Sequence, residues 1–505
     1  DPVKDIVPLC VYGHEAWDAA TARVGDIPLA KELPFYAVQQ RILMRDFGYL
    51  NPRNIYDYIA RGGYSSLVKA FFDMEPTSII DVIKKANLRG RGGAGFPAGT
   101  KWEGARNAKG EPKYVVCNAH EGEPNVFKDR RIMEGEPHMV IEGMIIEAFA
   151  IGSHIGYIYI GDEYPLAIRS MEHAVQQARD AGFLGKNILG SGYDLDIQVY
   201  MGGGAYISGE ASALQFGIEG QRAMPRTKPP RSVEAGVWGK PTCVNNVETM
   251  MFVPDIINHG ADWFLGLGTE KSPGTKMVTL MGLPKYVGLS EVPLGTSMRD
   301  LVFKVGGGIR NDRPFKAIQT GGTSGGLMLD NHLDLKLTFD NGPEDMGSVK
   351  GVLGSGGFVV YDDSVSIVDM TRYWMRFNRY ESCGKCVPCR IGTKTLLDIL
   401  DRIATGLGRV EDMDALKEWS DHVINMSLCG LGQAAPLPTL SAIELFRDEF
   451  MEAILNQNDP TGRNEALIAI QERRKLDPGY GRLPELLSGS GNGKGKVITL
   501  TPISR

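Results

Sequence analysis

Four of the seven cysteines in this chain are spaced like the ligands of a metal cluster. Cys383, Cys386 and Cys389 follow the pattern C-x2-C-x2-C, and Cys429 comes later, in Ser427-Leu-Cys-Gly. Three closely spaced thiolates joined by a distant fourth are typical of a [4Fe–4S] cluster. Zinc is the alternative, but it usually takes two separated C-x2-C pairs or a mixture of Cys and His, and no His lies within a few residues of either motif. The spacing therefore favours an iron–sulfur cluster.

A glycine-rich segment, residues 88–102, has the composition of a loop that approaches a ligand closely. Its G-x-G-x-x-G match is weak by itself, and it follows a helical pattern rather than a strand, so it is not an ordinary Rossmann turn. It is not a Walker A loop either, because no Gly-Lys-Ser/Thr follows. Clustered glycines let backbone amides approach a phosphate or a flat ring, and Arg91 and Lys101 add positive charge. The alternative is an ordinary surface loop.

Polar residues follow two predicted strands. The strand that begins at Tyr114 runs into Asn118, Glu121 and Glu123, and the strand at 194–200 runs into a glycine turn and then a helical pattern. In α/β proteins, ligands sit beyond the carboxyl ends of strands, and phosphates sit on helix N-termini. These side chains are therefore candidates for ligand binding. The alternative is that the Asn and Glu residues only cap the next helix.

Two further segments have ligand-binding character. Residues 221–231 carry four basic side chains, among them Lys228 and Arg231, although a run of this kind can also be a solvated face. Asn245 and Asn246 follow, and two adjacent amides can fix the polar edge of a ligand.

The elements that must position these residues fall into a recognisable order. Strands and helices alternate from about residue 114, which predicts an α/β fold with a largely parallel sheet. Short strands and glycine-rich turns follow, and helical patterns return around the cysteines. We divide the chain into an N-terminal lead-in (1–50), a Rossmann-like ligand-binding α/β domain (51–249), a β-grasp-like, soluble ligand-binding module (250–362), a helical domain for the cluster (363–455) and a flexible C-terminal extension (456–505). Within the extension, residues 497–500 have the pattern of a strand that can pair with an edge strand of a neighbour.

Composition narrows the class of protein. The chain has 505 residues and a net charge of −6, which argues against nucleic acid or an anionic membrane as a partner. No apolar run reaches the roughly 18 residues that a membrane span needs, and no secretory signal opens the sequence. Because cluster thiols need a reducing compartment, we expect a cytoplasmic location. The sequence begins at Asp1, without Met.

With these motifs in order, the chain resembles the flavin- and NADH-binding subunit of respiratory complex I. It is more similar still to the related β subunits of NAD(P)-linked, electron-bifurcating-type hydrogenases and formate dehydrogenases. The matching segments are residues 90–102, 118–123, 204–210, 228–230, 239–249 and the four cysteines. The greater similarity to the hydrogenase-type subunits rests on residues 51–63, 320–326 and 427–436.

The resemblance implies FMN against the glycine loops, held by Lys101, Asn118, Asn245 and Asn246, with a dinucleotide stacked on the flavin near Phe96. It also places Glu123 near the dinucleotide and implies it as the catalytic residue. The full set of cofactor-binding residues that it implies is Gly90, Arg91, Gly92, Gly93, Gly95, Phe96, Lys101, Asn118, Glu121, Glu123, Tyr206, Gly209, Glu210, Lys228, Arg231, Asn245, Asn246 and Thr249.

The activity implied is that of an NAD(P)H dehydrogenase, or diaphorase, subunit. Hydride would pass between nicotinamide and FMN, and single electrons would leave through the [4Fe–4S] cluster. Cys10, Cys117 and Cys243 are isolated and structural in this interpretation, so further clusters must lie in partners. The implied partners are a thioredoxin-like [2Fe–2S] subunit and a larger catalytic iron–sulfur subunit. The alternative is an electron-relay subunit whose nicotinamide site is altered or lost.

Four residues depart from the pattern of this family. His120 replaces an Asp, Ala211 replaces the second Glu of Gly-Glu-Glu, Arg231 replaces a Phe and Gly104 replaces an aromatic residue. Losing a carboxylate and gaining a guanidinium near the adenosine end would favour a 2′-phosphate, which leads to the hypothesis that NADP(H) is accepted or preferred. The alternative is a site that still uses NAD(H).

Overall fold

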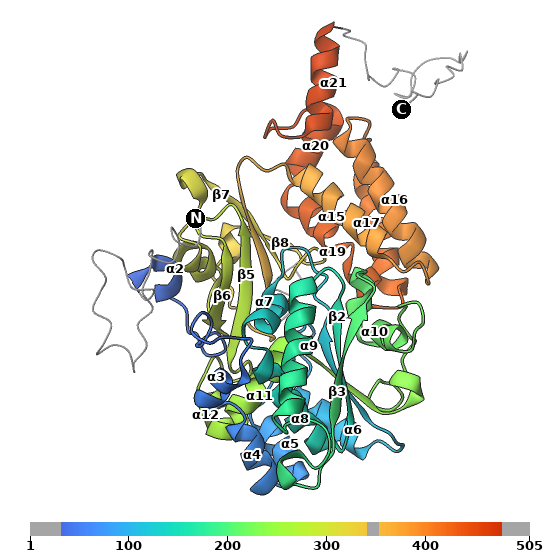
Figure 1. Ribbon diagram of the computed structural model, residues 1–505. Helices are drawn as coiled ribbons and strands as arrows, with labels where there is room; N and C mark the ends of the chain where they lie inside the picture. The colour runs from blue at the N-terminus through green and yellow to red at the C-terminus, as the bar shows by residue number, and fades with distance from the viewer. Residues whose placement is uncertain (1–31, 341–352, 477–505) are drawn as a thin grey trace.

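The computed structural model describes residues 32–340 and 353–476. An α/β domain, a second sheet beside it and a helical region follow one another along the chain (Figure 1). Among the described residues, no helix is long and apolar enough to cross a bilayer.

The first sheet has four parallel strands, as predicted. They are β1 (Tyr114–Ala119), β2 (Ile155–Gly161), β3 (Asp196–Gly202) and β4 (Thr242–Asn246), in the spatial order β3-β2-β1-β4. The chain builds outward from β1 to β3 and then returns to place β4 on the other side of β1. The carboxyl ends of β1 and β4 therefore flank a topological switch point, where ligands bind in open α/β sheets.

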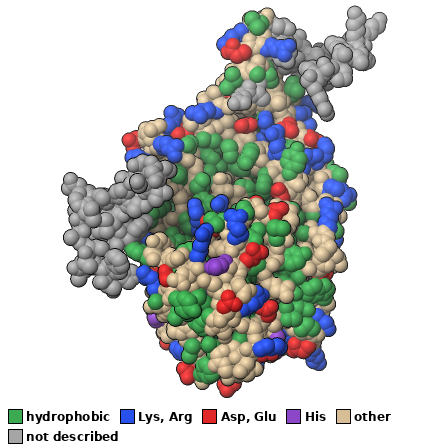
Figure 2. All heavy atoms as spheres, viewed as in Figure 1, with side chains coloured by type: hydrophobic (Ala, Val, Ile, Leu, Met, Phe, Trp, Pro, Cys, Tyr) green, Lys and Arg blue, Asp and Glu red, His purple; other side chains and the backbone are tan. Residues whose placement is uncertain are grey.

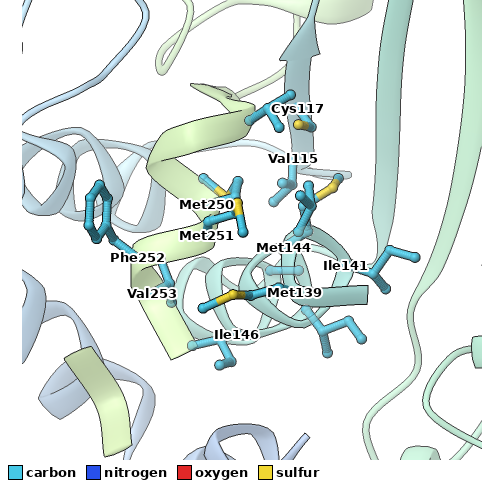
Figure 3. Packing of buried hydrophobic residues seen from close by; sticks show 14 of the residues in the cluster. Val115, Cys117, Met139, Ile141, Met144, Ile146, Met250, Met251, Phe252 and Val253 are labelled. Atoms are coloured by element: carbon cyan, nitrogen blue, oxygen red, sulfur yellow. The ribbon is translucent and has the colours of Figure 1, made fainter. Parts of the chain in front are cut away.

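Two apolar helices form the centre of the core below this sheet. These are α8 (Pro137–Ile151) and α11 (Val247–His259), and their methionines and aliphatic side chains interdigitate beneath β1 (Figure 3). Because α8 is buried around nearly its whole circumference, it can carry polar side chains only where they find partners. The other helices of this domain are α3 (Ile55–Ala60), α4 (Ser65–Phe72), α5 (Pro76–Lys85), α6 (Ala98–Asn107), α7 (Lys128–Gly135), α9 (Pro165–Asp180), α10 (Ala211–Ile218) and α12 (Ala261–Leu265).

The second sheet is mixed and agrees with the β-grasp-like prediction. Its order is β6 (Gly288–Pro293), β5 (Thr275–Gly282), β9 (Gly357–Asp362), β7 (Phe315–Thr320) and β8 (Leu327–Met328), with β5 and β9 parallel and the other pairs antiparallel. A short helix, α13 (Met298–Asp300), continues into a π-helical turn (Leu301–Val305) whose apolar side chains pack in the core of this module.

The predicted boundary at residue 249 needs correction. It falls inside α11, whose residues from Met250 onward pack with the core of the first domain. The α/β domain therefore includes this helix and α12 after it, and the second module begins near β5. No break is visible in the sequence at this point, because α11 is apolar on both sides of the predicted boundary.

The C-terminal region is helical, as predicted. It comprises α15 (Ile367–Glu381), α16 (Val387–Ala404), α17 (Asp412–Met426), α18 (Gly430–Ala434), α19 (Leu437–Leu445), α20 (Arg447–Leu455) and α21 (Glu465–Leu476). The last helix corrects the prediction that the chain is flexible from residue 456. Leu467 is buried in the helical core, and Asn464 donates a hydrogen bond to the carbonyl of Ala404 (3.0 Å). The glycine-rich run and the strand-like segment 497–500, expected to pair with an edge strand of a neighbour, lie outside the described residues.

The lead-in is tied to the rest of the fold by one buried carboxylate. After a single helical turn, α2 (Pro34–Ala37), Leu43 and Met44 enter the core, and their backbone N–H groups each donate to the Glu291 carboxylate at 3.0 Å. Thr275 donates to the same group at 2.5 Å. Glu291 thus joins the lead-in to two strands of the second sheet.

This carboxylate predicts a pH dependence of stability. Burial raises the pKa of Glu291 to about 7 from 4.5. A folded-state pKa above the unfolded value stabilises the fold at low pH, and that contribution is lost as the pH rises through the folded pKa. The melting temperature of the native chain should therefore fall more steeply between about pH 5 and pH 8 than that of Glu291→Gln, which cannot titrate. Glu103→Gln, at an exposed carboxylate paired with Lys84 (2.8 Å), is the control and should keep the native slope. Equal slopes for the native chain and Glu291→Gln would contradict the prediction.

Candidate functional site

A cleft of about 500 Å³ opens at the switch point of the first sheet. It brings together residues that lie far apart in the sequence: the glycine-rich loop, the ends of β1 and β4, the turn before α10, and Gly430 and Leu431 of the helical region. All but three of the predicted cofactor-binding residues line it, namely Gly90, Gly92, Gly95, Phe96, Lys101, Asn118, Glu121, Glu123, Tyr206, Gly209, Glu210, Lys228, Asn245, Asn246 and Thr249.

The glycine-rich loop connects α5 to α6 and forms one wall of the cleft. Gly90 donates to the carbonyl of Phe96 (2.9 Å), and the backbone N–H of Arg91 donates to the Thr249 hydroxyl (2.9 Å). A side chain at Gly92 would lie 3.2 Å from Asn246, and Gly95 has a φ of +63°. The glycines are therefore required for the close packing of this loop over the start of α11.

Three predicted residues lie outside the cleft. The Arg91 side chain is fully buried and donates to the carbonyls of Arg89 (2.9 Å) and Pro273 (2.8 Å). Its guanidinium lies between the rings of Phe252 and Phe339, so it stabilises the loop and is not available to a ligand. Gly93 packs toward Gly354, and Arg231 is exposed, with its backbone N–H donating to Glu234 (2.9 Å).

The polar groups on the floor of the cleft are held in place by hydrogen bonds to β4, to the turn before α10 and to the start of α11. The Lys101 ammonium donates to the carbonyl of Val244 (2.7 Å) and to the side-chain oxygen of Asn245 (3.3 Å). Asn118 donates to the carbonyl of Gly209 (2.8 Å). Asn246 caps α11 by accepting from Glu248 N–H (3.0 Å). The glycine wall and these fixed donors suit a flat, polar ligand with an anionic group.

The carboxylates of the cleft are already occupied by protein donors. Glu121 accepts the backbone N–H groups of Asp129 (3.1 Å) and Arg130 (3.0 Å) at the start of α7, and burial raises its pKa to about 8. Glu210 caps α10 in the same way. The capping alternative that the sequence leaves open is therefore present at Glu121, and Glu210 is a second capping residue. Both side chains also line the cleft.

Glu123 connects the two sheets. It accepts from the hydroxyls of Tyr206 (2.7 Å) and Thr323 (2.7 Å), and also from the backbone N–H of Thr323. Thr323 belongs to the glycine-rich turn after β7, so this carboxylate holds the second module against the cleft. Because the Glu123 carboxylate already accepts three hydrogen bonds from the protein, its position suits orienting Tyr206 better than exchanging a proton with a ligand.

Three titratable residues of the cleft, Lys128, Asp129 and His120, were absent from the predicted set. Lys128 is almost fully buried and contacts Asp129 (2.6 Å), Asn246 (3.2 Å) and Glu248 (3.3 Å). No signal in the sequence distinguishes it, because its partners include residues more than a hundred positions away. His120 is one of the departures from the family pattern. Its ring nitrogens have no hydrogen-bond partner among the described residues, and burial lowers its pKa to about 4.

The four cysteines of the motif line a second, small cavity together with Ile207, Pro225 and Leu431. Cys386 precedes α16 and Cys429 precedes α18, so the starts of two helices bring the distant thiols together. A donor set of four thiols at these helix starts fits a [4Fe–4S] cluster.

Comparison with known proteins agrees with this division into two sites. A family model described as the Nuo51 FMN-binding domain matches residues 83–255. One described as the NADH-ubiquinone oxidoreductase-F iron–sulfur binding region matches residues 369–453, which favours the iron–sulfur cluster over zinc. The NADP-reducing hydrogenase subunit HndC of Solidesulfovibrio fructosivorans is 46% identical over 85% of this chain and 86% of its own length. The chain belongs to the family that contains this subunit and the F subunits of NADH-quinone oxidoreductase.

An F subunit of NADH-quinone oxidoreductase and one solved structure support the same assignment. The F 2 subunit of NADH-quinone oxidoreductase of Rhizobium meliloti (strain 1021) is 42% identical over 83% of this chain and 99% of its own length. A crystal structure of NAD+-reducing [NiFe]-hydrogenase in the H2-reduced state superposes with a TM-score of 0.72 at 29% identity, covering 91% of this chain and 74% of that one. As a member of this family, the chain is an NAD(P)H dehydrogenase component of an oxidoreductase complex, with FMN and a [4Fe–4S] cluster as cofactors.

In this member of the family, the cleft and the thiol cavity share a wall. Ile207 and Leu431 line both of them, and Tyr206 and Cys429 lie close to these two residues in the sequence. The segment that carries the first three cysteines is held next to this wall by two hydrogen bonds. The Tyr206 backbone N–H donates to Glu381 (2.8 Å), and Lys385 donates to the carbonyl of Pro225 (2.7 Å). The fold thus places the cleft and the thiol cavity side by side, with the apolar side chains of Ile207 and Leu431 between them.

Proposed function

We propose that the cleft holds FMN and admits a nicotinamide nucleotide from its open side. The observation that carries this proposal is the convergence of the glycine wall, Lys101 and the paired asparagines in one cleft that shares a wall with the thiol cavity. When bound there, FMN would supply the chemistry that converts a two-electron exchange with nicotinamide into single-electron transfers. The shared wall between the sites suits that transfer.

Within this proposal, the residues of the chain bind, orient and exclude water. Lys101, Asn118, Asn245 and Asn246 hold the flavin, while Phe96, which is 45% exposed, offers a ring to the incoming nucleotide. Glu123 is assigned a positioning role through Tyr206 instead of the catalytic role that the sequence suggested. No side chain is required as a nucleophile.

The nucleotide preference is a separate proposal. Ala211 lines the cleft where the family pattern has a carboxylate, and Lys228, at the rim, is exposed and lies 3.3 Å from Glu210. With Arg231 exposed three residues further on, two exposed cations are available to a 2′-phosphate. The name of one relative, an NADP-reducing hydrogenase subunit, supports NADP(H); the names of the NADH-quinone oxidoreductase relatives support NAD(H).

One anaerobic titration tests both proposals. The protein, loaded with FMN and cluster, is titrated with NADH and separately with NADPH while flavin bleaching is followed. We expect bleaching by NADPH at a concentration about tenfold or more below that of NADH, since one phosphate–guanidinium pair supplies a ratio of that order. Preference for NADH would overturn the NADP(H) proposal alone. Bleaching by neither nucleotide would overturn the dehydrogenase site and favour an electron relay.

We further propose partners that continue the electron path. A thioredoxin-like [2Fe–2S] subunit and a larger catalytic iron–sulfur subunit, of hydrogenase or formate dehydrogenase type, would supply the further centres of the path. We also propose that nucleic acid is not a partner, because the net charge of the chain is −6. Figure 2 shows acidic and basic side chains on one face, with a group of basic side chains near its centre. The cytoplasmic location proposed here depends on the need of cluster thiols for a reducing compartment.

A further inference from the structure

A buried carboxylate behind the first sheet reaches the floor of the cleft. Glu147 lies in the second half of α8, and its side chain is fully buried. It accepts a hydrogen bond of 2.6 Å from the side-chain amide of Asn245, a residue of β4 that lines the cleft. Glu147 itself does not line the cleft, so it can act on a ligand only through Asn245.

This contact fixes which end of the Asn245 amide faces Lys101. The NH2 group of Asn245 donates to Glu147 and lies 3.6 Å from the sulfur of Cys243, so its oxygen is left to accept from the Lys101 ammonium. In the flipped orientation, an amide oxygen would face the carboxyl group and an NH2 group would face the ammonium. With the Glu147 carboxyl ionised, both contacts would then be repulsive.

The orientation of Asn245 in turn determines what Lys101 can offer a ligand. An ammonium group has three donors, and two of them are used by the Val244 carbonyl and the Asn245 oxygen. One donor remains for the cleft, which Lys101 lines. A flipped Asn245 would remove one of the two acceptors that hold the ammonium, and the remaining donor would lose its fixed direction.

We propose that Glu147 is a positioning residue for the FMN site: it locks the amide of Asn245, which holds Lys101 so that one N–H is directed at an oxygen of FMN. The inference rests on the proposed assignment of the cleft to FMN. The oxygen can belong to the phosphate or to a ring carbonyl, since both accept hydrogen bonds from an ammonium group.

The test compares two substitutions at the same position. In Glu147→Gln, the amide oxygen still accepts from Asn245, whereas in Glu147→Leu no acceptor remains. The full chain, freed of its flavin, is titrated with FMN, and binding is followed by quenching of flavin fluorescence. We expect Glu147→Leu to bind FMN about tenfold more weakly than the native chain and Glu147→Gln to stay within about threefold. Similar losses in both variants, or no loss in Glu147→Leu, would overturn the proposal.

A matched control lies on the same helix. Glu142 is also buried, but it accepts from Tyr58 (2.6 Å) and from the backbone of Tyr64 (2.8 Å), away from the cleft. Glu142→Leu should lower the melting temperature and leave FMN affinity unchanged. If Glu147→Leu does not fold, Glu147→Ser tests the same contact, because serine is too short to reach Asn245 and leaves room for water.

Two further measurements separate this inference from its premise. If Glu147 acts through Lys101, adding Glu147→Leu to Lys101→Met should cause little further loss, whereas additive losses would overturn the proposal. Riboflavin, which lacks the phosphate, identifies the acceptor: a loss seen only with FMN assigns it to the phosphate, and an equal loss with both flavins assigns it to the ring. Failure of the native chain to bind FMN would instead overturn the assignment of the cleft.

Discussion

Replacing Cys429 by Ser should remove the iron–sulfur cluster while leaving the flavin in place. Cys429 supplies the fourth thiol from the start of α18, and the other three come from the loop before α16 and its first turn. A hydroxyl is a poor substitute for a thiolate at iron, so bound iron should fall from about four per chain to fewer than about one. Iron analysis and the visible spectrum of the cluster measure this, and FMN content should stay at the native level.

Cys117→Ser is the matched control for this prediction. Cys117 is a fully buried thiol on β1, in the apolar core between the sheet and α11 (Figure 3). Its replacement should reduce stability without changing iron content. Native iron content in Cys429→Ser would contradict the assignment of the fourth ligand, and loss of iron in the control would show that the cluster responds to general destabilisation.

The parts of the site that could be predicted are those formed by residues close together in the sequence or by a regular pattern of strands and helices. Cys383, Cys386 and Cys389 lie within one loop and helix start, so their spacing alone indicated the cluster. The alternation of strands and helices predicted the parallel sheet, and a parallel sheet has its ligand crevice where the strand order reverses. That rule brings Asn118 and Asn246 together although they are far apart in the chain.

Prediction from the sequence failed where a side chain's role depends on partners from distant elements. Arg91, next to the glycines, has the appearance of a ligand-binding cation, but Phe252 and Phe339 enclose it, and neither is near it in the sequence. Lys128 was missed for the opposite reason, since its partners convert an apparently ordinary helix-start lysine into a buried cation. Charge and residue type indicate a chemical capacity, while burial and pairing decide whether a ligand can use it.

Replacing Glu248 by Gln should cause a large loss of stability. This carboxylate is fully buried at the start of α11 and lies 2.6 Å from Lys276 of β5 and 3.3 Å from Lys128 of α7. Removing one partner of a buried ion pair leaves an uncompensated charge and typically costs about 3–5 kcal/mol. Here two ammonium groups lose a partner, although Lys128 keeps Asp129 at 2.6 Å. Urea unfolding should therefore show a decrease in the free energy of unfolding at the upper end of that range.

The pH dependence and a second substitution separate this electrostatic cause from a packing defect. Burial lowers the pKa of Lys276 to about 8, against 10.5 for an exposed lysine, even with Glu248 present. Without Glu248, that pKa should fall further. The folded state then releases the proton more readily than the unfolded state, so the stability of the variant should rise as the pH increases above neutrality. Adding Lys276→Met to Glu248→Gln should recover part of the loss, because an apolar side chain of similar length needs no counter-charge.

The control is the exposed pair of Lys85 and Asp262, which lie 2.9 Å apart with most of both side chains in solvent. Asp262→Asn should change stability little or not at all, since water and salt screen such a pair. Equal effects of Glu248→Gln and Asp262→Asn would contradict a buried role for this network. A much larger loss of stability in Glu248→Gln would show that buried ion pairs join α7, α11 and β5 beneath the cleft. In this network, each charged side chain is stabilised by a partner from another element. The floor of the cleft and the second sheet would then unfold as one unit, because neither can separate without leaving an unpaired charge in the core.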